Sequence, residues 1–99
     1  MMTETQAHAA LAGYDSFDRL EPRIAEQPWM AVPGGWSVAG ELQGWRYRLD
    51  GMPGGVRVIA PTPDGGRADG VDRAEVVAGH GEWAMAQLAR AFEVGVPDK

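Results

Sequence analysis

The chain has 99 residues, 44 % of them hydrophobic, and a formal net charge of −5. This length suits one domain with one small core, and the apolar share argues against global disorder. The absence of cysteine excludes disulfide scaffolds, cysteine nucleophiles and thiolate metal sites, and the acidic balance argues against a general nucleic-acid binder. No apolar run is long enough to span a membrane, and the chain does not start like a signal peptide, so we expect a cytoplasmic protein.

Residues 3–27 are predicted to be helical. Thr3 can cap a helix, and Gln6 follows three residues later, which matches a capping box. Pro22 cannot occupy a helix interior without losing a hydrogen bond and clashing with the preceding turn. Gly13 weakens the first segment, and Ser16 can cap a second one in which Phe17, Leu20 and Ile24 share a face. We therefore expect a broken helix, in which Glu21 ends one turn and Pro22 opens the next.

Residues 28–35 contain two prolines and two glycines and are predicted to form a linker. Residues 36–60 are predicted to form a three-stranded antiparallel sheet, because polar and apolar residues alternate over 45–50 and again after the glycine-rich segment 51–55. A shorter strand over 36–39 completes the sheet. Its predicted core face carries Trp36, Val38, Trp45, Tyr47, Leu49, Val56 and Val58.

Residues 61–71 are rich in glycine and proline and are predicted to form a loop. Residues 72–94 are predicted to form a helix capped by Asp72, with an apolar stripe at helical spacing. An alternative makes 74–78 a fourth strand, because Val76 and Val77 are β-branched.

The predicted fold class is therefore α+β, in a single domain over 1–99. It has two layers: an N-terminal broken helix, a three-stranded antiparallel meander, and a C-terminal helix packed on one sheet face.

The candidate binding residues are arginines and one tryptophan. Arg46, Arg48 and Arg57 leave the sheet face opposite the aromatic residues, with Arg57 expected across from the other two. Guanidinium groups gathered in this way suit a carboxylate, a phosphate or an acidic protein surface, although a solvated face balanced by acidic neighbours explains them as well. Trp83 projects away from the apolar stripe of the last helix and falls beside Arg90, so it is either an interface anchor or packed inside the monomer.

Residues for common catalysis are missing. His80-Gly81-Glu82 has the H-x-E spacing of zinc deaminases, but those enzymes also need cysteines. Phosphate-binding glycine motifs and the serine nucleophile motif are absent. We therefore predict no metal and no cofactor, and we favour a non-enzymatic role.

Two family comparisons fail on particular residues. The segments 27–29 and 32–36 loosely resemble the opening of MbtH-like proteins, which activate adenylation domains, but the later signature of that family is missing. The helix–strands–helix order resembles double-stranded-RNA-binding domains in topology. Asp72 and Glu75 stand where those domains carry basic residues, so we assign no family.

The sequence favours a small non-catalytic protein that binds another protein through an acidic or carboxylate-bearing surface. An inhibitor, immunity or anti-defence protein of a phage or mobile element is the expected kind, by analogy. The alternative is a small enzyme or small-molecule binder with a pocket between the sheet and the last helix, with His80, Glu82 and Arg46 near its mouth. A third hypothesis, a homodimer through a strand edge or Trp83, is compatible with the first.

Overall fold

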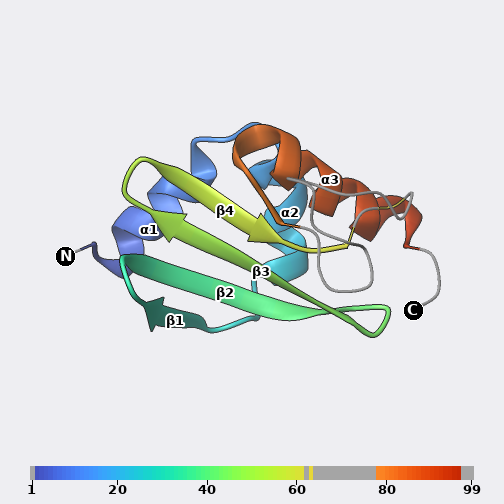
Figure 1. The fold of residues 1–99 in the computed structure, drawn as a ribbon, viewed down its shortest axis with the longest axis horizontal. Coiled ribbons are helices and arrows are strands. Elements are labelled where there is room, and N and C mark those ends of the chain that lie inside the picture. Colours follow the sequence, from blue (N-terminus) through green and yellow to red (C-terminus); the bar gives the residue numbers. More distant parts are fainter. Residues whose placement is uncertain (1, 62, 64–77, 97–99) are drawn as a thin grey trace.

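The structure, a computed structural model, describes residues 2–61, 63 and 78–96. The described residues form two helices, then five strands and then a third helix, an α+β arrangement that confirms the predicted class (Figure 1). In chain order they are α1 (Glu4–Ala12), α2 (Phe17–Ile24), β1 (Trp29–Val32), β2 (Gly35–Leu42), β3 (Trp45–Met52), β4 (Gly55–Ile59), β5 (Ala78–His80) and α3 (Gly81–Val94). The predicted loop over 61–71 and the predicted cap at Asp72 lie almost wholly outside the described residues, as does the 74–77 part of the alternative strand.

The N-terminal segment forms two separate helices. The predicted capping box of α1 is confirmed: the Thr3 hydroxyl accepts a hydrogen bond from the Gln6 N–H, and the Gln6 side chain accepts one from the Thr3 N–H. The expected break at Pro22 is wrong, because Pro22 lies inside α2. The proline removes only the bond to the Asp18 carbonyl, and both residues are exposed, so water can hydrate that carbonyl.

The sheet has five antiparallel strands in the order β1-β2-β3-β4-β5, not the predicted three. The predicted linker over 28–35 is wrong, because Trp29–Val32 pairs with β2 through a two-residue turn at Pro33-Gly34. Gly34 has φ 86°, and proline followed by such a glycine is typical of a type II turn. Pro28 and Pro33 therefore lie outside the paired residues Trp29–Val32, so their missing N–H groups remove no hydrogen bond between the strands.

The second added strand comes from the segment predicted as a helix over 72–94. Residues 78–80 pair with β4, and the helix begins only at Gly81. Gly81 has φ 71°, so the chain turns there from the strand into α3 in a conformation that glycine adopts without steric strain.

The main hydrophobic core lies between the sheet and the helices, and Trp45, Ala91 and Val96 form a second, smaller cluster. Figure 1 shows the strands in front with α1 and α2 behind them. The predicted core face is confirmed, since its members are buried except for Trp36, which is partly exposed. The helices add Leu11, Phe17, Leu20, Ile24, Met85 and Leu88 to this core. The contact between α1 and β3 is close: a Cβ on Gly51 would lie 2.7 Å from the Ala7 carbonyl oxygen.

Candidate functional site

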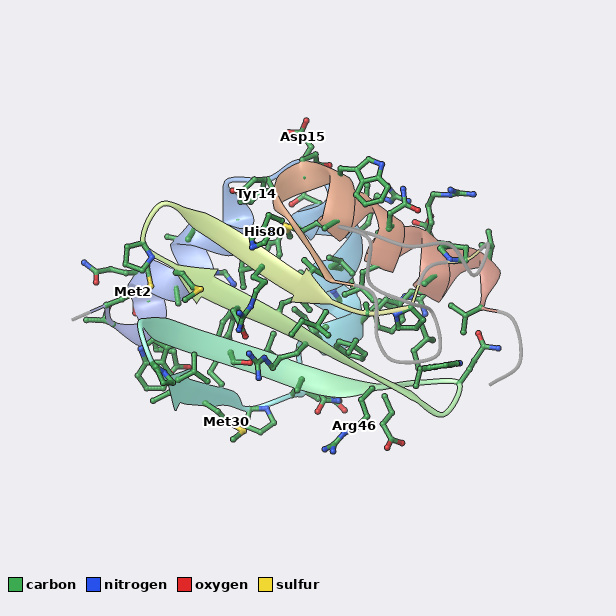
Figure 2. The ribbon with its side chains drawn as sticks, in the orientation of Figure 1. Met2, Tyr14, Asp15, Met30, Arg46 and His80 are labelled. Atoms are coloured by element: carbon green, nitrogen blue, oxygen red, sulfur yellow. The ribbon has the colours of Figure 1, made fainter. Side chains whose placement is uncertain are left out.

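The helices cover one face of the sheet, and in the described part of the chain no helix covers the other. We call this second face the open face. Because side chains alternate along a strand and the register is known, its members can be read from the pairing. They are Met30, Val32, Ser37, Ala39, Glu41, Arg46, Arg48, Asp50, Met52, Arg57, Ile59 and His80. Figure 2 labels Met30, Arg46 and His80 on three of the strands.

A buried carboxylate joins two arginines at the centre of the open face. Asp50 is 1 % exposed. Arg48 donates Nε–Oδ1 and Nη2–Oδ2 bonds of 2.9 and 2.8 Å to it, and Arg57 donates Nε and Nη2 bonds of 3.0 and 2.7 Å to Oδ2. Ser37 on β2 is buried and is the register partner of Asp50, and its side chain also hydrogen-bonds to the carboxylate. We call this group the Arg–Asp–Arg cluster.

The charge state of Asp50 follows from these contacts. Burial by itself raises the pKa of the carboxyl, but the hydrogen bonds from Arg48, Arg57 and Ser37 outweigh burial and hold the pKa below its usual value. Asp50 is therefore ionised at neutral pH, and the cluster carries two positive charges against one negative charge. Each arginine side chain remains 39 % exposed, so part of each guanidinium faces outward.

The register corrects the expected arrangement of the arginines. Arg57 stands opposite Asp50, and Arg48 stands opposite Ile59, so the two arginines meet diagonally through the carboxylate. Arg46 lies nearer the β2–β3 turn, opposite Glu41, and is exposed. The three arginines therefore share the open face, but only two belong to the cluster.

The other two candidate binding residues lie elsewhere. Trp83 and Arg90 are both on α3, which packs on the covered face of the sheet, and both are exposed. Trp83 keeps 55 % of its surface accessible, so it is not packed inside the monomer. The five candidate residues accordingly do not form one surface.

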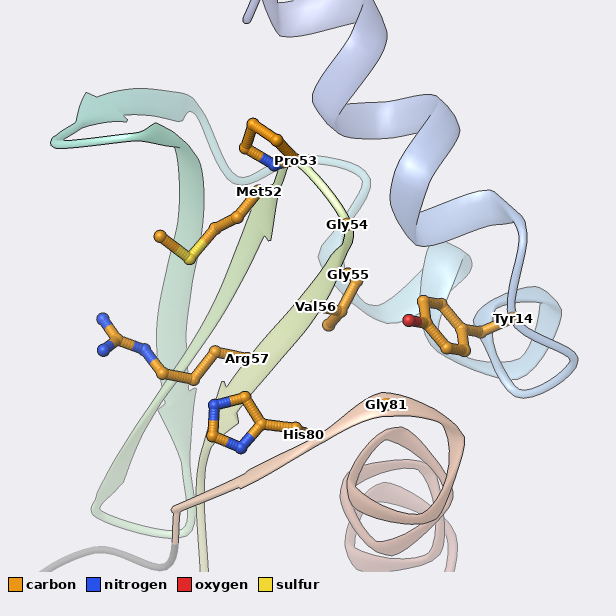
Figure 3. Close-up of a pocket in the computed structure, with 9 residues that line it drawn as sticks. All are labelled: Tyr14, Met52, Pro53, Gly54, Gly55, Val56, Arg57, His80 and Gly81. Carbon is orange, nitrogen blue, oxygen red and sulfur yellow. The ribbon is translucent and has the colours of Figure 1, made fainter.

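A hollow of about 360 Å³ opens where β5 ends and α3 begins (Figure 3). We call it the hairpin hollow, because the β3–β4 hairpin forms one of its walls. Its described lining residues are Tyr14, Met52, Pro53, Gly54, Gly55, Val56, Arg57, His80 and Gly81. The sequence singled out His80 and Arg57 as candidate site residues. It did not indicate that Tyr14 and the β3–β4 hairpin lie beside them, because no sequence spacing relates these segments.

The residues expected around a pocket at the last helix separate in the structure. Arg46 borders a different hollow of about 310 Å³, together with Ala39, Tyr47, Arg48 and Ile59. Glu82 ties α3 to the start of α2: its carboxylate accepts hydrogen bonds from the Ser16 N–H at 3.1 and 3.2 Å and from the Ser16 hydroxyl. A carboxylate at the N-terminus of α2 also interacts favourably with the helix dipole. Glu82 is therefore a structural link, and only His80 lines the hairpin hollow.

Within the described residues no group of three metal-ligating side chains comes together. None of the described helices is long and apolar enough to cross a membrane. Comparison of the chain with protein-family models, with curated proteins and with solved structures finds no match. A proposal for the function therefore depends on the geometry of this chain alone.

Proposed function

We propose that the chain is a protein-binding module whose open face docks on an acidic surface of another protein. The observation that carries this proposal is the Arg–Asp–Arg cluster, which presents two fixed and partly exposed guanidiniums at the centre of a sheet face. A solvated face has no need of a buried carboxylate to hold its arginines in place.

The cluster reduces the cost of binding. A flexible arginine loses side-chain freedom when it is immobilised at an interface, at about 0.5–1.5 kcal/mol per side chain. Asp50 already holds Arg48 and Arg57 by two hydrogen bonds each. Their outward edges can therefore pair with carboxylates of a partner with little further ordering.

The surroundings of the cluster favour a protein partner over a nucleic acid. The open face carries three guanidiniums and two carboxylates, so its excess positive charge is small, and the whole chain is acidic at −5. A phosphate backbone needs a much denser basic surface. Met30 at the outer strand is 61 % exposed, and Ile59 and Ala39 add apolar surface. Arginine and methionine beside apolar groups are typical of protein interfaces.

The test is affinity capture from a lysate of the source organism with matched charge reversals. Arg46→Glu changes an exposed arginine on the open face, and Arg90→Glu makes the same change on α3. We expect a partner that the unmodified chain and Arg90→Glu both retain and Arg46→Glu loses, with all three proteins equally folded by circular dichroism. The proposal is contradicted if all three proteins retain the partner equally, or if only Arg46→Glu retains one. It is also contradicted if no protein is enriched above a bait-free control.

A module of this kind would act by occupying its partner's surface, as inhibitor and immunity proteins do. Its acidic net charge limits unspecific binding to nucleic acid, while the open face stays locally positive.

A further inference from the structure

We propose that the hairpin hollow binds a small molecule that carries a carboxylate on a compact apolar body. This goes beyond protein docking on the open face, because the hollow lies at one edge of the sheet and is lined from three separate segments. Its volume of about 360 Å³ lies at the lower end of the range of small-ligand sites.

The hollow exists because β4 extends beyond β5. Arg57, Val58 and Ile59 pair with β5, whereas Gly55 and Val56 pair, among the described strands, only with β3. After His80 the chain turns away into α3, which leaves this stretch of the β4 edge uncovered by β5. Edge backbone groups of a strand are available to a polar ligand atom.

The polar side of the hollow suits a single negative charge. Arg57 and His80 are register partners, and Figure 3 shows their side chains next to each other on one side of β4. The positive end of the α3 dipole begins at Gly81. None of the described lining residues is acidic. A carboxylate can pair with the edge of a guanidinium, and the N-terminus of α3 adds positive potential to the hollow.

The remaining lining of the hollow is largely apolar. Met52, Pro53 and Val56 supply aliphatic surface, and Figure 3 shows Met52 on the same side of β4 as Arg57. Figure 3 shows the ring of Tyr14 on the side of β4 away from Arg57. The Tyr14 side chain lies near two of the lining glycines: a Cβ on Gly55 would be 3.5 Å from the Tyr14 hydroxyl, and one on Gly81 would be 3.9 Å from the ring. A ligand with a compact aromatic or aliphatic body would cover these groups while its carboxylate faces Arg57.

The space depends on Gly55 having no side chain. No positive φ is found at Gly55, and an added Cβ meets its nearest neighbour at ordinary van der Waals distance. Valine therefore fits the strand, and its methyl groups occupy the hollow. Gly13 also has a negative φ and is not one of the described lining residues, so it provides a glycine control.

The experiment is a titration of the ¹⁵N-labelled protein with benzoate and with its neutral analogue benzamide, followed by amide chemical shifts. Benzoate should cause saturable shifts at Gly54, Gly55 and Gly81, and benzamide should not. Gly55→Val should weaken benzoate binding at least about tenfold, and Gly13→Ala should leave it unchanged. Arg57→Lys keeps the charge that pairs with Asp50 but loses the planar fork, so it should weaken binding severalfold even if Gly55→Val does not fold.

Two further arms separate the alternatives. Acetyl-phenylalanylalanine with a free C-terminus tests whether the carboxylate belongs to a peptide end: tighter binding than benzoate supports a peptide terminus, and weaker binding supports a free acid. Arg46→Glu should leave the benzoate titration unchanged, so failure of the hollow and failure of open-face docking are distinguishable. The inference is overturned if benzoate causes no saturable shifts, or if benzamide causes equal shifts. It is also overturned if neither Gly55→Val nor Arg57→Lys changes the affinity for benzoate.

Discussion

Asp50→Asn is the substitution that most directly tests the Arg–Asp–Arg cluster. The change keeps the size and one acceptor of the side chain but removes the charge that two guanidiniums share. Breaking a fully buried ion pair costs about 3–5 kcal/mol. Arg48 and Arg57 are each 39 % exposed, so water can solvate them once the pair is broken, and we expect a smaller loss. We predict a loss of about 2–3 kcal/mol at pH 7, or roughly 8–24 °C in Tm for a domain of this size.

The pH dependence supplies a second readout. The pKa of Asp50 lies below its ordinary value in the folded chain, so its contribution to stability is fully present above the pKa of an unfolded aspartate, about 3.9. That contribution disappears as the pH falls through the folded pKa. The difference in unfolding free energy between the unmodified chain and Asp50→Asn should therefore be constant above about pH 5 and shrink below about pH 4.

Urea denaturation between pH 2.5 and pH 7 measures both effects. Asp15→Asn is the control, because Asp15 is an exposed aspartate and its substitution should stay within about 0.5 kcal/mol (Figure 2). If Asp50→Asn loses no more stability than Asp15→Asn at pH 7, the Arg–Asp–Arg cluster does not stabilise the fold. A difference that stays constant down to pH 2.5 would show that the charge of Asp50 is not its cause.

The remaining predictions concern the packing of helices on the sheet and on one another. Glu82→Ala should cost about 2 kcal/mol in urea denaturation, because Ser16 is buried and loses the acceptor for its N–H and hydroxyl, and Glu82→Gln should restore part of the loss. Gly51→Ala should cost about 1–3 kcal/mol, because the new methyl group would lie 2.7 Å from the Ala7 carbonyl oxygen; an unchanged Tm would contradict the close packing of α1. Arg19→Ala should leave the denaturation midpoint unchanged within error, because its bond to Glu93 joins two exposed side chains.

Local patterns predicted the part of the fold that depends on neighbours in sequence. The alternation over 45–50 assigns Tyr47 and Leu49 to the core and Arg46 and Arg48 to the other face, and the structure has this arrangement. A period of two residues is a property of any strand, so it can be read without knowing the partner strand. The capping box of Thr3 and Gln6 is equally local, since its partners are three residues apart.

The same reasoning failed where pairing overrides local composition. Residues 28–35 have the prolines and glycines of a loop, yet four residues between Pro28 and Pro33 are enough to add a strand to an existing edge. A strand forms there because these residues pair with β2, and the intrinsic conformational preferences of the residues do not predict that pairing. The start of the last helix was placed too early for a related reason, because Ala78–His80 is held as a strand by β4.

The candidate sites show the same division. The sequence by itself determined that three arginines share one face, because they stand at alternate positions of two neighbouring strands. Only the tertiary structure decided that Asp50 is buried between two of them, since that depends on which residues meet across the β3–β4 pair. The hairpin hollow depends on tertiary structure altogether, because Tyr14, Gly55 and His80 come together only when β5 ends short of β4 and α3 turns back over the sheet edge.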